Sequence, residues 1–126
     1  VPPDDLDGAL ARIHDALRPG GLFICEPWLT PELFIPDRPH LLVVDRPELK
    51  ISRHVVTQVE GRASILDYQI LVSRPGEPVA HLRDLNVLYL VTDEELRSAL
   101  ERAGFVLEQT REGFMKDRPL LVLRRS

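Results

Sequence analysis

Hydrophobic residues recur with two different periods along this chain of 126 residues, and the changes of period constrain its fold more than any other feature. Residues 4–17 place apolar side chains at helical spacing, and residues 94–103 do the same near the other end. Between them, residues 48–91 mostly alternate apolar and polar side chains with the period of two that marks β-strands. We therefore expect two helices separated by a long β-rich insertion.

Three short apolar stretches flank the helices. Leu22–Cys25 follows the helix-ending Arg18-Pro19-Gly20-Gly21 and is continuously apolar, which is typical of a strand buried on both faces in a sheet covered by helices. Phe105–Gln109 and Leu120–Leu123 follow the second helix, which opens with a Thr92-to-Glu95 capping box. The predicted fold class is α/β.

The insertion divides into a loop and a meander. Residues 29–47 are proline-rich and predict an irregular loop with one short strand at Leu41–Asp45. Three longer strands follow, separated by turn sequences, and predict an antiparallel sheet with one covered face and one more polar face. These strands are Glu48–Glu60, Ala63–Val72 and Val79–Val91.

The composition excludes several classes of function. The net charge of -4, with scattered arginines, argues against nucleic-acid binding. No apolar run approaches the ~20 residues that span a bilayer. The single cysteine, Cys25, lies in an apolar run, so we expect a small buried side chain and a cytoplasmic protein. No His, Cys or acidic pair has metal-ligand spacing on one element, so no metal site is predicted.

Four motifs of the sequence resemble those of a known family. Leu17-Arg18-Pro19-Gly20-Gly21 before an apolar strand is similar to the turn that precedes the fifth sheet strand of class I S-adenosylmethionine-dependent methyltransferases, and Ala103-Gly104-Phe105 is similar to the end of their last helix. Glu26-Pro27-Trp28 with Pro31-Glu32 resembles a stretch of the small-molecule N-methyltransferases that make dimethylamino sugars, as does His81-Leu82-Arg83-Asp84-Leu85-Asn86. Asn86 and Leu29 depart from that pattern, where the family has histidine and tryptophan.

The resemblance implies an architecture. Residues 1–28 and 92–126 would form the C-terminal half of a Rossmann-like methyltransferase core, with strands resembling the fifth, seventh and sixth of the family. Residues 29–91 would form an inserted antiparallel sheet that binds the acceptor or makes a homodimer. The methyl donor would be S-adenosylmethionine. None of the seven glycines forms the G-x-G turn that cradles this donor, so we expect a missing N-terminal half, in the same or another chain, to bind most of it.

The candidate site residues follow from position and resemblance. Glu26 and Trp28 follow the carboxyl end of a predicted buried strand, the edge where open α/β sheets bind ligands. Phe114-Met115 lies between the last two strands, where a loop could close over the acceptor or simply connect them. We expect substrate binding by Glu26, Trp28, Tyr68, Asn86 and Tyr89, with His54 or His81 as a base; His14 and His40 are expected at the surface.

Three functions remain open from the sequence. The first is the acceptor-binding part of a small-molecule methyltransferase, possibly acting on the amine of an amino sugar. The second is a non-catalytic, methyltransferase-derived module for dimerisation or small-ligand binding. The third is an unrelated small α+β binding protein. The pairing of Leu22–Cys25 with Leu120–Leu123 discriminates the third from the others, because the methyltransferase resemblance fails if these strands are not neighbours in one sheet.

Overall fold

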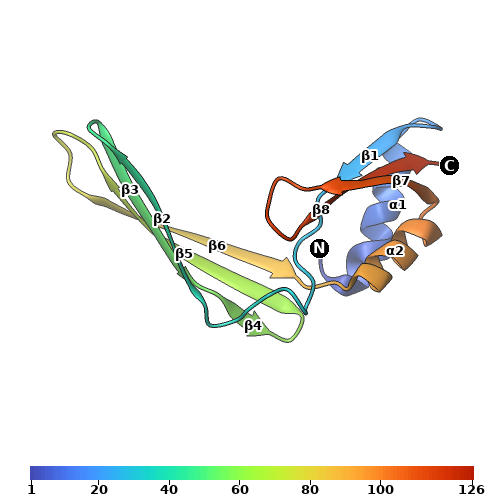
Figure 1. Ribbon diagram of the computed structural model, residues 1–126, viewed down its shortest axis with the longest axis horizontal. Helices are drawn as coiled ribbons and strands as arrows, with labels where there is room; N and C mark the ends of the chain where they lie inside the picture. The colour runs from blue at the N-terminus through green and yellow to red at the C-terminus, as the bar shows by residue number, and fades with distance from the viewer. The chain divides into compact units, whose positions relative to one another are not determined.

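The computed structural model describes all 126 residues and divides them into two compact units. The core unit comprises Val1–Phe34 and Tyr89–Ser126, and the insert unit comprises Ile35–Leu88 (Figure 1). The boundaries expected from the sequence, at residues 28/29 and 91/92, differ from this division, which falls at 34/35 and 88/89, and they stay a prediction. No helix of the chain is both long and apolar enough to cross a membrane.

The core unit contains two helices and a three-stranded sheet. A short 3-10 turn, Pro3–Asp5, leads into α1 (Leu6–Ala16), and α2 spans Asp93–Arg102. The strands are β1 (Leu22–Cys25), β7 (Phe105–Glu112) and β8 (Pro119–Arg125), in the order β1-β8-β7. Because β8 runs antiparallel to both neighbours, β1 and β7 are parallel to each other. Leu22–Cys25 and Leu120–Leu123 are therefore neighbours, as the methyltransferase fold requires and the unrelated α+β fold does not.

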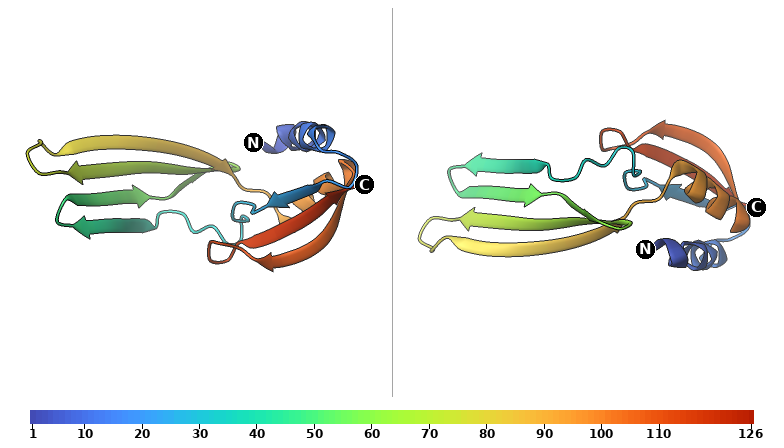
Figure 2. Two further views of the ribbon diagram at one scale, coloured as in Figure 1. Left: turned by 90° about the horizontal axis from the view of Figure 1, so that it is seen from above. Right: turned by 90° about the horizontal axis from the view of Figure 1, so that it is seen from below.

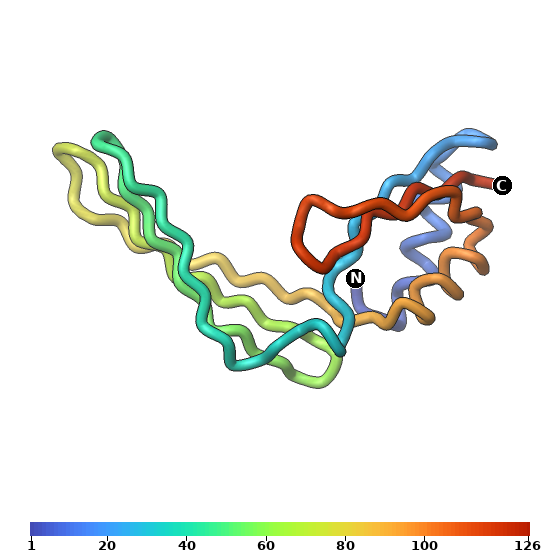
Figure 3. The backbone as a smooth tube through the Cα atoms, in the orientation of Figure 1, coloured from blue at the N-terminus to red at the C-terminus, as the bar shows by residue number.

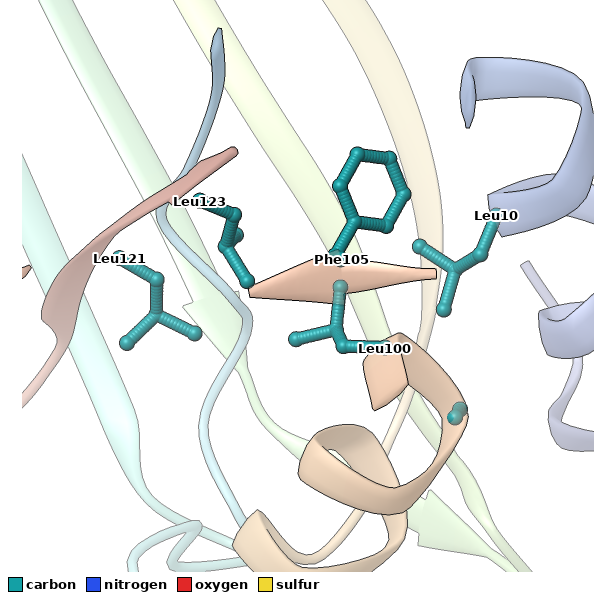
Figure 4. Packing of buried hydrophobic residues seen from close by; sticks show 6 residues of the cluster. Leu10, Leu100, Phe105, Leu121 and Leu123 are labelled. Carbon is teal, nitrogen blue, oxygen red and sulfur yellow. The ribbon is translucent and has the colours of Figure 1, made fainter. Parts of the chain in front are cut away.

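Both helices contribute to one hydrophobic core against the sheet. The capping box at Thr92 fixes the start of α2, since Thr92 Oγ1 accepts from Glu95 N–H and Glu95 Oε2 accepts from Thr92 N–H. Gly104, at φ +88°, ends the helix one residue before β7. The buried cluster contains Leu10, Ala99, Leu100, Phe105, Leu121 and Leu123 (Figure 4).

His14, at the edge of this core, differs from the expectation. The sequence predicts a surface position, but the His14 ring contacts the Phe105 ring edge-on, with 5.5 Å between the centroids. Its side chain is only 19% exposed. The reason is that α1 turns this residue toward the start of β7, where Gly104 has no side chain to exclude the imidazole.

The insert unit is an antiparallel sheet, as predicted, but it has more strands than the period of two indicated. Its strands are β2 (Pro39–Arg46), β3 (Leu49–Val56), β4 (Gln58–Glu60), β5 (Ala63–Ser73) and β6 (Ala80–Tyr89). The four longer strands lie side by side in one layer, and the β2–β3 and β5–β6 turns lie at the same end of it (Figures 2 and 3). The short strand expected at Leu41–Asp45 is longer and pairs with β3 along its whole length.

The predicted strand Glu48–Glu60 is interrupted at Thr57. Its backbone leaves the ladder to bond with the incoming segment, since Asp37 N–H donates to Thr57 O and Thr57 N–H donates to Arg38 O. The buried Thr57 hydroxyl donates to Ile35 O at 2.8 Å and accepts from Arg38 N–H at 3.1 Å. A buried hydroxyl needs such partners. The periodic pattern gave no sign of this break because Thr57 still faces the covered side.

Candidate functional site

The core unit gathers charged and aromatic side chains at the carboxyl end of β1. Glu26 directly follows β1, and its side chain is only 14% exposed. Its carboxylate accepts hydrogen bonds from two successive backbone amides of the β7–β8 loop, Phe114 N–H at 3.0 Å and Met115 N–H at 3.1 Å. Glu26 is therefore a structural anchor for a segment almost ninety residues further along the chain.

Arg118, at the end of the same loop, makes the reciprocal connection. Its guanidinium donates to Glu26 O at 2.9 Å and to Pro27 O at 2.8 Å, and its Nε lies 3.5 Å from Glu26 Oε1. Sequence reasoning did not identify Arg118, because no local pattern separates it from the other arginines. The role of Arg118 becomes visible only through its contacts with Glu26 and Pro27, which are distant in the sequence and are brought near by the pairing of β1 with β8.

Trp28 lies beside this ion pair. The Arg118 guanidinium carbon is 5.2 Å from the Trp28 ring centroid, within the range of a cation–π interaction. The Phe34 ring also lies near the indole, with 6.2 Å between the ring centroids and 53° between the ring planes. The indole is half-buried, so part of it remains available to a ligand.

Cys25 precedes these residues and packs against the hydrophobic core. Burial raises the pKa of its thiol; Arg118 opposes this shift and Glu26 adds to it. A raised pKa keeps the thiol protonated and weakly nucleophilic. This agrees with the expectation of a small packed side chain.

In the insert unit, the two candidate bases lie on the same face of the sheet. His54 of β3 is the ladder partner of Gln69 on β5, and His81 of β6 bonds to the same glutamine, with Nε2 2.8 Å from Gln69 Oε1. Directly opposed residues of an antiparallel pair point to the same side. His54, Gln69 and His81 therefore form one row across three strands, and both histidines are exposed.

The hydrogen-bond network assigns the tautomer of His81. Gln69 Nε2 donates to Asp67 Oδ1 at 3.1 Å, so its carbonyl oxygen is the atom that faces the imidazole. An oxygen that only accepts requires His81 Nε2 to carry a hydrogen, which leaves Nδ1 of the neutral ring as a proton acceptor. Asp67 is held in turn by Arg83, through Nε at 2.7 Å and Nη2 at 2.8 Å.

Tyr68 and Asn86 lie on the opposite face of the insert sheet from the histidines, because side chains alternate along each strand. The Arg53 guanidinium carbon lies 4.6 Å from the Tyr68 ring centroid. Asn86 and Tyr89 are half-buried, and Tyr89 is the last residue of β6. The register thus divides the candidate residues of the insert between two faces, which the sequence pattern alone did not do.

The chain contains no cradle for a nucleotide-like methyl donor. Such a cradle is a glycine-rich turn between a strand and a helix. The one direct strand-to-helix connection, from β6 to α2, runs through Leu90, Val91 and Thr92 and has no glycine. The left-handed glycines lie elsewhere, at 20, 61, 76 and 104. The residues of this chain therefore do not form the main binding site for S-adenosylmethionine. No group of three or more His, Cys, Asp or Glu side chains is arranged to hold a metal ion.

Comparisons with known proteins agree with this architecture. A curated dTDP-3-amino-3,4,6-trideoxy-alpha-D-glucopyranose N,N-dimethyltransferase of Streptomyces venezuelae is 30% identical over 110 residues, which cover 87% of this chain and 46% of the relative. A dTDP-4-amino-2,3,4,6-tetradeoxy-D-glucose N,N-dimethyltransferase of Saccharopolyspora spinosa is 32% identical over 105 residues, 83% of this chain and 42% of the relative. The chain is a homologue of the amino-sugar N-methyltransferases.

Solved structures show that the chain is similar to methyltransferases in fold as well as in sequence. The crystal structure of Streptomyces venezuelae DesVI matches with a TM-score of 0.87 and 30% identity, covering 98% of this chain and 52% of DesVI. CalS10 of Micromonospora echinaspora, an amino pentose methyltransferase in a structure with bound SAM, matches with a TM-score of 0.83 and 25% identity, covering all of this chain and 52% of CalS10. No protein-family model matches the chain. This chain thus spans about half the length of the relatives it matches and corresponds to their C-terminal part.

Proposed function

We propose that this chain forms the acceptor-binding part of an S-adenosylmethionine-dependent N-methyltransferase that acts on the amine of a nucleotide-linked amino sugar. The observation that carries the proposal is the match to DesVI over 98% of the chain at 30% identity, which includes β1 and the aromatic and charged residues that follow it. The relatives of known name act on dTDP-linked amino sugars.

Methyl transfer from S-adenosylmethionine to an amine requires the protein mainly to orient the two reactants. S-adenosylmethionine supplies an already activated methyl group, so the acceptor side must hold an unprotonated amine in line and exclude water. In the core unit, Trp28 offers a partly exposed aromatic face beside Arg118, suited to a ring and to a neighbouring negative charge. Glu26 supports this arrangement through its bonds to the β7–β8 loop.

A proton must leave the amine, and of the two candidate histidines His81 is the one whose hydrogen bonding leaves a ring nitrogen able to accept it. Its Nδ1 is free in the tautomer that Gln69 imposes, and its ring is exposed. Tyr68, Asn86 and Tyr89 remain proposed acceptor contacts on the insert strands. A non-catalytic module is the less favoured alternative, because the matched relatives of known name are enzymes.

A pair of titrations of the chain, followed by NMR, tests this assignment. We expect a dTDP-linked 3-amino sugar to shift the Trp28 indole resonance and S-adenosylmethionine to shift nothing at millimolar concentration. Because neither variant has an indole, binding by the variants is followed through the backbone amide shifts that the acceptor induces: Trp28→Ala should abolish these shifts, whereas Trp28→Phe, which keeps a ring, should retain part of them. Micromolar affinity for S-adenosylmethionine would contradict the proposal, since it would place the donor site in this chain.

A further inference from the structure

The loop between β7 and β8 combines a fixed base with an exposed apolar tip. Phe114 is 90% exposed and Met115 is 56% exposed. Exposed single apolar residues are common, but an aromatic ring at the tip of a loop loses the stabilisation that burial would give it. Such a ring becomes informative when the loop that carries it is held in one conformation.

Four contacts hold this loop. The Glu26 carboxylate binds the amides of Phe114 and Met115 themselves, so the backbone under both exposed side chains is fixed. Arg118, whose side chain is only 18% exposed, donates to the carbonyl groups of Glu26 and Pro27. Because hydrogen bonds to charged groups are stronger than neutral ones, these contacts resist opening of the loop.

The loop is also closed across its base. Gly113 N–H donates to Arg118 O at 3.0 Å, and a Cβ atom on Gly113 would lie 2.2 Å from that oxygen and 3.1 Å from Glu26 Cδ. Only glycine fits so close an approach. The loop between these two residues is therefore a defined platform, anchored at the carboxyl end of β1.

This edge is where ligands bind in open α/β sheets. We propose that Phe114 and Met115 are specificity-determining contacts for the acceptor, and that Glu26 and Arg118 are positioning residues that hold the loop for this purpose. The inference rests on the proposed function and names the part of the acceptor involved. A flat exposed phenyl ring suits stacking against an aromatic base, so the platform receives the thymine base of the nucleotide-linked sugar. Glu26 then acts on the acceptor through the loop, since both its oxygens are engaged by amides.

Hydrogen exchange of the 126-residue chain tests the positioning role first. Glu26→Gln replaces one accepting oxygen with an NH₂ group, which cannot accept from the amide it faces. We expect exchange at the Phe114 and Met115 amides to accelerate about tenfold or more, with the amides of α2 and the thermal midpoint little changed. Glu32→Gln, an exposed carboxylate in the segment after β1, is the matched control. Unchanged exchange in Glu26→Gln would overturn the positioning role.

Titration with thymidine diphosphate, followed by the same amide resonances, tests the contact itself. We expect its shifts to concentrate at residues 113–118, and Phe114→Ala to weaken its binding about tenfold. Phe114→Trp should restore binding, while Val79→Ala, at another exposed apolar side chain, should leave it unchanged. Glu26→Gln should weaken binding although Phe114 is still present, whereas the control Glu32→Gln should not.

The failures of the two proposals are distinguishable. Equal affinity in Phe114→Ala, or shifts that lie away from the loop, would overturn the platform while leaving methyl transfer possible. An absence of methyl transfer in an enzyme that contains this chain would overturn the proposed function while leaving both loop measurements intact. Because Phe114 is almost fully exposed, its substitution tests the platform even where a change at Glu26 unfolds the chain.

Discussion

At the scale of single residues, the register of the insert sheet decides which side chains meet. Asp67 and Arg83 are sixteen positions apart, yet their side chains form a bidentate pair across β5 and β6. The same register brings Gln69 to His81 and orients its amide. Neither contact follows from the period of the sequence alone, because a shift of one residue would exchange the faces of the whole strand.

The Asp67–Arg83 pair predicts a measurable titration. The hydrogen bond from Arg83 holds the pKa of Asp67 below its ordinary value of 3.8. A depressed pKa in the folded state contributes stability above pH 3.8, and this contribution is lost as the pH falls through the lower folded value. We expect a carbon-13 NMR titration of the Asp67 carboxyl to have its midpoint below 3.8 and to move upward in Arg83→Gln. Arg46→Gln, on β2, should not move it; a midpoint at or above 3.8 in the unaltered chain would refute the pairing.

At the scale of helices and strands, the sequence was most informative where one local pattern is sufficient. The capping box at Thr92, the helix end at Gly104 and a strand at Leu22–Cys25 all follow from short-range chemistry, and all are confirmed. The expected burial of that strand on both faces is wrong, because the helices cover only the face of Phe23 and Cys25 and leave Leu22 and Ile24 exposed on the other. The break at Thr57 was missed because its cause is the distant segment Ile35–Arg38.

The candidate site likewise has one part that the sequence predicts and another part that depends on contacts between distant residues. The edge after β1 was predictable from the position of Glu26 and Trp28 beside an apolar run. The partners of these residues were not, because Arg118 lies about ninety positions away and reaches them only through the pairing of β1 with β8. The division of Tyr68 and His81 between two faces also needed the register.

The start of α2 gives a prediction at this scale. Thr92→Ala removes the acceptor for Glu95 N–H while leaving the helix sequence intact. We expect the free energy of unfolding to fall by about 1 kcal/mol, the usual effect of losing an N-cap hydroxyl. Denaturant unfolding measures this, and Thr92→Ser, which retains the hydroxyl, should behave like the unaltered chain. An unchanged unfolding midpoint in Thr92→Ala would mean that the cap does not stabilise the fold.

At the scale of the whole molecule, the chain resembles one part of a larger catalytic architecture. It spans about half the length of the curated relatives it matches, and its strand order β1-β8-β7 reproduces the expected fifth, seventh and sixth strands. Leu22 and Ile24, on the sheet face opposite the helix-covered core, remain exposed, as do several apolar residues of the insert. Such surfaces commonly bind protein partners, and the homodimer expected from the sequence remains a prediction.

The most direct test of the account is methyl transfer by a chimera in which residues 1–126 follow the donor-binding half of the Streptomyces venezuelae relative. Mass spectrometry of a dTDP-linked 3-amino sugar incubated with S-adenosylmethionine would detect the product. If this chain forms the acceptor-binding part, one and then two methyl groups appear on the amine, and Trp28→Ala raises the KM of the sugar more than the KM of the donor. A folded chimera that binds S-adenosylmethionine but leaves every such amine unmethylated would contradict it.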